Sequence, residues 1–299
     1  MTNKLPCSLP STSFVGAVRR LTAIALVLVG FSGSAFCQQA GSADSDEASQ
    51  ATNERAERLF KLFDEDAASL EFIAEANEEK YSLVKQPLFR FSTEGTVFGT
   101  VYVWHDAAAR LAVMGTIGSL PIRGTNTQFV ELHLLKPEPI LPVTIRGFPD
   151  KRWQPDVEEL AFKSFAKAPA VAGSERMRLV QMRNLIRQFT AEMRHRELTN
   201  QLRLLPQPIY RYADSTKERD GALFAFVWDN GTDPELVLRI ESSEQADGVV
   251  WQYQPVRLTW RELDLHHQGE QVWHVDEFLE RNQPDQRTPY ITGLTKPIP

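Results

Sequence analysis

The residues of this chain best suited to chemistry are three acidic side chains around one predicted hairpin, Asp220, Asp233 and Glu235. Paired carboxylates carry out glycoside hydrolysis, which needs the two groups about 5–10 Å apart. The hairpin places Asp220 where its first strand begins, whereas Asp233 and Glu235 flank the turn at the other end. One strand length, about 20 Å, separates those ends. The spacing therefore favours turn capping by short acidic side chains over a shared catalytic site.

A second candidate is a group of histidines near the C-terminus, which together with acidic neighbours could ligate zinc. If Gln268-Gly269 is a two-residue hairpin turn, His267 pairs with Glu270 and His274 pairs with Leu263. The two imidazoles then lie two residue pairs apart, which is too far for one ion. We therefore expect no metal site and no cofactor. The histidines of this group are His266, His267 and His274.

Nucleophilic and nucleotide-binding enzymes carry distinctive motifs, and this sequence has no Gly-x-Ser-x-Gly, no phosphate-binding glycine loop and no Cys-x-x-Cys. Arginines on the second predicted helix could form a basic stripe for an anionic partner, although a solvated helix face is the default explanation for them. Tryptophans on predicted strands could stack on sugars, but core packing explains most of them. An anionic or carbohydrate ligand therefore stays open. The arginines are Arg176, Arg183, Arg187 and Arg194.

Two amphipathic helices and a series of strands must position these residues. Apolar residues at three- and four-residue steps predict a helix over residues 54–80 and a second helix after the N-cap Ser174. The second helix has the apolar seam Leu179, Met182, Ile186, Phe189 and Met193. Strands are predicted at 88–91, 97–104, 111–117, 129–134, 143–146, 222–228, 235–241, 249–253, 256–265 and 271–275.

This pattern predicts an α+β fold in which antiparallel β-meanders pack against the two helices. Within it, the strand at 222–228 is apolar on both faces, so we expect it to be central and covered on both sides.

An internal repeat is indicated by two hexapeptides, QPLFRF at residues 86–91 and QPIYRY at residues 207–212, which match in residue class at every position. A predicted helix precedes each copy, and a strand that ends in Trp104 or Trp228 follows it. We interpret this as two similar units related by duplication. Chance similarity between two strand starts is the alternative.

The N-terminus has the order of a secretory signal. Arg19 and Arg20 precede an apolar run over residues 21–31, and small residues follow it. The run is short for a membrane span, so we expect a signal peptide at 1–37 and no stable span after its cleavage. Cleavage after Ala35 or after Cys37 fits equally well.

The rest of the chain divides by composition. Residues 38–53 form a flexible acidic linker, 54–148 a first α+β unit, 149–173 a proline-rich connector, and 174–299 a second unit with a loose C-terminal tail. The net charge of −6 argues against binding to nucleic acid. We expect a periplasmic or extracellular protein.

Three stretches carry a resemblance: LRLLPQPIYRY (202–212), DGALFAFV (220–227) and GTDPE (231–235). Together they resemble an uncharacterised family of exported planctomycete proteins. The resemblance implies export and a similar fold, and it implies no reaction, cofactor or partner. The candidate binding residues within these stretches, for which a structural role is favoured, are Arg203, Arg211, Tyr212, Asp220, Asp233 and Glu235.

The sequence therefore predicts an exported, noncatalytic binding or structural protein. The alternative is a secreted hydrolase whose site is assembled from residues distant in sequence.

Overall fold

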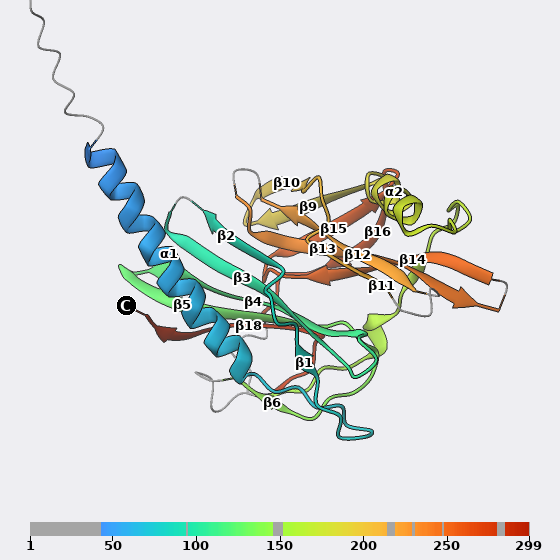
Figure 1. Ribbon diagram of the computed structural model, residues 1–299, viewed down its shortest axis with the longest axis horizontal. Coiled ribbons are helices and arrows are strands. Elements are labelled where there is room, and N and C mark those ends of the chain that lie inside the picture. The colour runs from blue at the N-terminus through green and yellow to red at the C-terminus, as the bar shows by residue number, and fades with distance from the viewer. Residues whose placement is uncertain are drawn as a thin grey trace, which may run out of the picture. The chain divides into compact units, whose positions relative to one another are not determined.

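The computed structural model describes residues 43–93, 95–145, 152–213, 219–228, 231–246, 248–279 and 285–298. The predicted signal peptide and the first residues of the predicted linker lie outside these ranges. The chain from Ser45 to Pro299 forms one compact unit. Its described part is built from mostly antiparallel sheets and two α-helices, which confirms the α+β expectation (Figure 1).

The first sheet has the strand order β1-β3-β4-β5-β18, and β2 also pairs with β3. Its long strands β3, β4 and β5 form a meander at the predicted positions. The strands are β1 (Ser82–Leu83), β2 (Phe89–Thr93), β3 (Val97–His105), β4 (Leu111–Ile122), β5 (Thr125–Leu134) and β18 (Tyr290–Pro297).

The second sheet has the order β16-β15-β9-β10-β12-β13-β14-β8, and β11 also pairs with β12. Its strands are β8 (Lys163–Ser164), β9 (Phe189–His195), β10 (Leu198–Leu204), β11 (Tyr210–Ala213), β12 (Asp220–Val227), β13 (Pro234–Gln245), β14 (Gly248–Arg257), β15 (Glu262–His267) and β16 (Glu270–Val275).

The predicted proline-rich connector at 149–173 contains more structure than expected. Its described part includes β7 (Arg152–Trp153), the 3₁₀ helix η1 (Glu158–Leu160) and β8, which pairs with Gln252 and Tyr253 of β14. Two-residue strands carry too little periodicity to be seen in a sequence. A small sheet joins β7 to β6 (Val143–Thr144) and β17 (Asp285–Gln286).

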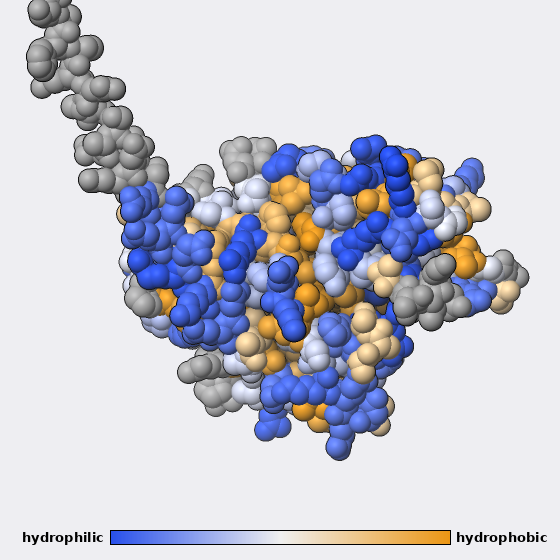
Figure 2. Space-filling view, in the orientation of Figure 1, coloured by the Kyte–Doolittle hydropathy of each residue, from blue (hydrophilic) through white to orange (hydrophobic). Residues whose placement is uncertain are grey.

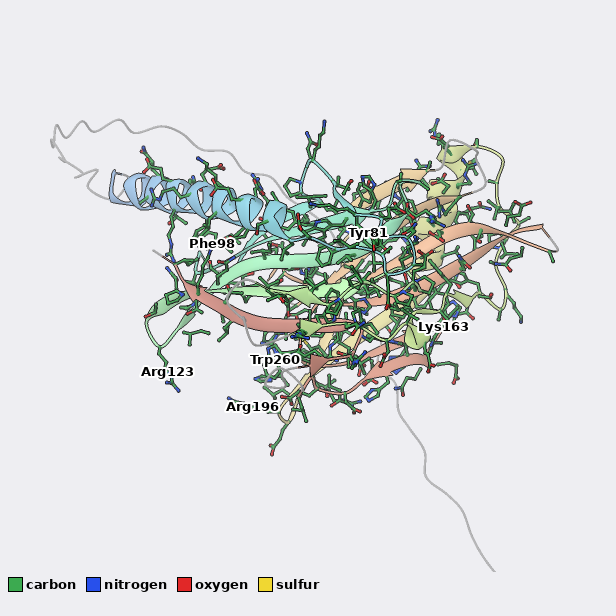
Figure 3. The ribbon with its side chains drawn as sticks, turned by 90° about the horizontal axis from the view of Figure 1, so that it is seen from below. Tyr81, Phe98, Arg123, Lys163, Arg196 and Trp260 are labelled. Carbon is green, nitrogen blue, oxygen red and sulfur yellow. The ribbon has the colours of Figure 1, made fainter. Side chains whose placement is uncertain are left out.

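Helix α1 spans Ala43–Ser69, so the linker prediction is wrong for its described residues, which are helical. Acidic residues favour a helix N-terminus, and a helix propagates readily once its packed part has formed. That packed part presents Leu59, Phe63 and Ala67 to the first sheet, one turn apart, with all three buried. Phe98 of β3 lies beneath this helix (Figure 3).

Helix α2 spans Glu175–Ile186, and Ser174 caps it as predicted, because its Oγ accepts a hydrogen bond from the backbone of Met177 at 3.4 Å. The predicted seam is wrong beyond Ile186, since Phe189 and Met193 belong to β9. These two residues fit a helical period, but they also alternate with polar residues as a half-buried strand requires. Arg194 also lies on β9, so the predicted basic stripe of four helical arginines does not form.

The fold has four layers: a helix, the first sheet, the second sheet and a second helix. Helix α1 packs on the outer face of the first sheet, and α2 packs on the outer face of the second. Strand β12 shows how the inner faces meet. Its residues Phe224 and Phe226 pack with α2, whereas Leu223 and Ala225 join a cluster with Val101 of β3. All eight residues of β12 are buried, which confirms a central strand covered on both sides.

The C-terminal tail is not loose, and this prediction is also wrong. Strand β18 pairs with β5, with Tyr290 opposite His133 and Thr292 opposite Glu131. The segment is rich in β-branched and aromatic residues, which favour strands, and the flanking prolines hid that signal. Strand β5 belongs to the first sheet. The predicted second unit at 174–299 therefore supplies one strand, β18, to the sheet that the first unit forms.

In each half, two strands that follow one another in the chain pair with the same long strand. Ser82 of β1 lies opposite His105, and Arg203 of β10 lies opposite Val227. After each of these strands comes a hexapeptide whose own strand pairs with the same long strand. Phe91 lies opposite Gly99, and Tyr212 lies opposite Gly221. The long strands β3 and β12 thus hold matching positions in the two sheets.

Candidate functional site

Strand β12 separates the candidate binding residues into two groups, as the sequence predicts. Asp220 begins the strand, next to Arg211 and Tyr212 on the paired strand β11. At the other end, Val227 lies opposite Pro234, which is flanked by Asp233 and Glu235. Eight residues of strand span about 26 Å at roughly 3.3 Å per residue. The carboxyl groups at the two ends cannot act on one substrate atom.

Asp220 is the centre of a buried ionic clamp. Its Oδ2 accepts hydrogen bonds from Nε of Arg178 at 2.7 Å and from Nη2 of Arg211 at 2.8 Å. Its backbone N–H donates to Oγ of Ser242 at 3.0 Å. Asp220 is 0% exposed, so no substrate can reach it. The clamp joins α2, β11, β12 and β13, and this is a structural task.

Tyr212 belongs to a second network on the inner face of the second sheet. Its Oη donates to Glu241 at 2.8 Å and accepts from Nε of Arg239 at 2.8 Å, while Arg239 and Glu241 form an ion pair at 2.7 Å. Gln252 donates to the other carboxylate oxygen of Glu241 at 3.1 Å. Burial raises the pKa of Tyr212 well above its usual range. Such a satisfied buried network fixes one packing arrangement.

Arg203 is exposed on β10, and its Nη2 donates to the backbone oxygen of Gly231 at 3.1 Å. It therefore holds the loop that precedes β13. Like Asp220 and Tyr212, it binds another part of the protein.

At the other end of β12, the charges of Asp233 and Glu235 act on each other, and a third carboxyl group, from the first sheet, acts with them. Glu131 of β5 accepts a hydrogen bond from Tyr290 Oη at 2.5 Å. Burial raises the pKa of Glu131 to about 8, and the charge of Glu235 adds to this. Burial also raises the pKa of Asp233 well above its usual range, with further contributions from Glu235 and Glu131. We call Glu131, Asp233 and Glu235 the carboxyl cluster.

Nothing in the local sequence pattern indicates that Glu131 belongs to this cluster. Glu131 and His133 alternate along β5 with the apolar residues Val130, Leu132 and Leu134, a pattern typical of a strand with one solvated face. The second sheet covers that face instead, and both residues are buried.

Arg257 and Arg261 lie beside the carboxyl cluster. Nη1 of Arg261 is 3.4 Å from Glu235, and both guanidinium groups also contact groups outside the cluster. Nη2 of Arg257 donates to the backbone oxygens of Trp260 and Arg261, at 2.7 and 2.9 Å. The guanidinium of Arg261 lies 4.8 Å from the ring centre of Trp228 and 5.4 Å from that of Trp260. Trp260 also contacts His195, next to the turn that carries Arg196 (Figure 3). Arg261 thus covers aromatic surface that the sequence offered for sugar stacking.

The C-terminal histidines lie on the predicted hairpin, with His267 opposite Glu270. A register shift between Leu265 and His266 places His274 opposite Asp264, so the expected pairing with Leu263 is wrong. Asp264 accepts a hydrogen bond from Nδ1 of His274 at 2.8 Å, which raises the pKa of His274.

Glu262, Asp264 and His274 bring ligand atoms within 4.8 Å of one another, as a metal site would require. Arg194 pairs with both carboxylates, at 2.7 Å from Asp264. Its guanidinium supplies the positive charge that a metal ion would otherwise bring to these carboxylates.

One hollow lies between α1, β5 and β18, and none of the candidate binding residues lines it. Asp66, Gln128 and Lys296 are among its lining residues. Asp66 pairs with Lys296 at 2.8 Å and accepts a hydrogen bond from Gln128 at 2.8 Å. The helices in the described part of the chain are too short or too polar to cross a membrane.

Comparison with known proteins identifies no relative. The chain matches no protein-family model, no curated protein and no solved structure.

Proposed function

We propose that this is an exported protein that binds a partner or supports a structure without catalysis. The observation that carries the proposal is the clamp at Asp220, in which the most deeply buried candidate carboxylate is held by Arg178 and Arg211. A catalytic acid or base needs contact with substrate, and Asp220 is fully enclosed. Tyr212 and Arg203 likewise bind protein groups.

Export and membership of the planctomycete family remain part of this proposal, and they place the protein in the periplasm or outside the cell. N-terminal sequencing of the protein from its native host tests export. The mature chain is expected to begin between Phe36 and Ala40. A mature chain beginning at Met1 would exclude export through this signal.

We also propose that the chain contains two similar units related by duplication. The matching register of the hexapeptides supports this, and so does their place in the fold. Both lie at the seam where the inner faces meet, a region with hydrophobic residues near its centre (Figure 2). The first unit contributes Leu88 and Phe89 to this seam, and the second contributes Ile209 and Tyr210 at the equivalent positions.

An anionic or carbohydrate ligand is the partner class we propose. A glycan array that holds neutral and sulfated sugars tests it. Arg176 and Arg187 are exposed at α2, where their guanidinium groups could contact the sulfate groups of a glycan. Binding to sulfated glycans that weakens in the double variant Arg176→Gln, Arg187→Gln supports the proposal. Absence of binding to every glycan contradicts this ligand class.

The carboxyl cluster favours a second candidate function, a hydrolase, because it assembles Glu131, Asp233 and Glu235 from distant parts of the sequence. Purified protein can be assayed against chromogenic glycosides, esters and phosphoesters beside Asp233→Asn. The noncatalytic proposal predicts equal background rates. Turnover that disappears in Asp233→Asn, at an unchanged urea midpoint, would establish the hydrolase instead.

A further inference from the structure

The carboxyl cluster joins the two sheets. Glu131 lies on β5 of the first sheet, and Glu235 lies at the start of β13 in the second. These two residues are 7% and 4% exposed. Any negative charge on them is therefore almost completely removed from water, which is unfavourable unless a cation contacts it directly.

Direct cationic contacts are weak in this cluster. Among the residues that the structure describes, the closest cation is Arg261, whose Nη1 lies 3.4 Å from Glu235. Asp220, in the same sheet, instead receives two guanidinium groups at 2.7 and 2.8 Å. Asp220 thus has two cations at hydrogen-bond distance, whereas the carboxyl cluster has none so close among the described residues. Carboxyl groups that are buried without such close cations favour the protonated form.

The groups that face the cluster from neighbouring elements bring no closer positive charge to it. Tyr290 of β18 donates a hydrogen bond to Glu131 and carries no charge. His133 of β5 is neutral, because burial and the charge of Arg257 lower its pKa to about 4. Asp276 and Glu277 follow β16, and their negative charges raise the pKa of Arg257. Arg257 and Arg261 are the main positive groups acting on Glu131.

We propose that the carboxyl cluster is a pH-sensitive joint between the two sheets. The joint is closed while the carboxyl groups hold protons, and it loosens when they release them to solvent. Burial gives these groups a higher pKa in the folded chain than in the unfolded chain. The stability they contribute is therefore complete at acidic pH and is lost as the pH rises through their folded pKa values.

Urea unfolding between pH 6.5 and 8.5 tests the joint, since His133 titrates below this range. The variants are Glu131→Gln and, as control, Glu270→Gln, which alters an exposed residue of the β15–β16 turn. We expect the wild-type midpoint to fall as the pH rises. Glu131→Gln should show a smaller fall and a higher midpoint than wild type at pH 8.5, and Glu270→Gln should follow wild type.

An equal fall in wild type and Glu131→Gln would overturn the proposal. If Glu131→Gln does not fold, the partly exposed Asp233 is replaced by Asn, and the same smaller fall is expected. Carbon NMR of the side-chain carboxyl of Glu131 gives an independent reading in the wild-type protein. A titration midpoint near 8 supports the joint. A midpoint near the ordinary glutamate value of about 4.3 would overturn it.

Discussion

Gly221 lies beneath the ring of Tyr212, so closely that a β-carbon at Gly221 would fall 2.4 Å from Cζ of that ring. Gly99 has the same relationship to Phe91, with a corresponding distance of 2.1 Å. In each half, the last aromatic residue of the hexapeptide packs on a glycine of the long strand. The glycines are therefore needed for close approach.

Gly99→Ala and Gly221→Ala should each destabilise the protein by about 1–3 kcal/mol, because the new methyl group displaces an aromatic ring. Gly173→Ala is the matched control, since a β-carbon there meets nothing within 4 Å, and it should change stability by less than about 1 kcal/mol. Urea unfolding measures all three. A large effect at only one of the two sites would contradict their equivalence.

Phe226→Ala should destabilise the protein by about 3–5 kcal/mol, because the side chain is 1% exposed and fills the space between β12 and α2. Leu279→Ala removes a large apolar side chain that is 71% exposed, and it should have almost no effect on the urea midpoint. Equal midpoints for the two variants would show that this face of β12 is not part of the core.

His133 should make the protein less stable in acid. Burial lowers its pKa to about 4, below the ordinary value of 6.5. A lowered folded pKa gives stability that is present above pH 6.5 and is lost as the pH falls towards 4, by up to about 3 kcal/mol. Thermal unfolding of wild type and His133→Gln between pH 7 and 4 measures this. If both lose stability in parallel, His133 is not the group responsible.

Local pattern predicted much of this fold. The meander β3–β5, the cap at Ser174 and the two-sided burial of β12 follow from periodicity and turn chemistry, which act over a few residues. The end of α2 was missed because Phe189 and Met193 satisfy both a helical and a strand period. Strand β18 was missed because the prolines that flank it hid its local strand pattern, and its pairing with the distant β5 leaves no local sign.

The candidate site divides in the same way. The separation of Asp220 from Asp233 follows from the length of one hairpin, so the sequence predicted it. The partners Arg178 and Glu131 could not be predicted, because only the tertiary packing of α2 and of the first sheet brings them to β12. Long-range pairs of this kind leave no local pattern.

The central claim is that Arg203, Arg211, Tyr212 and Asp220 hold the fold together, and Asp220 tests it most directly. The measurement is the free energy of unfolding of Asp220→Asn in urea, beside Asp276→Asn, whose side chain is 94% exposed. Asn leaves Arg178 and Arg211 without their counter-charge, so a loss of about 3–5 kcal/mol is predicted for Asp220→Asn, and less than about 0.5 kcal/mol for the control. Equal stability of the two variants would contradict the claim.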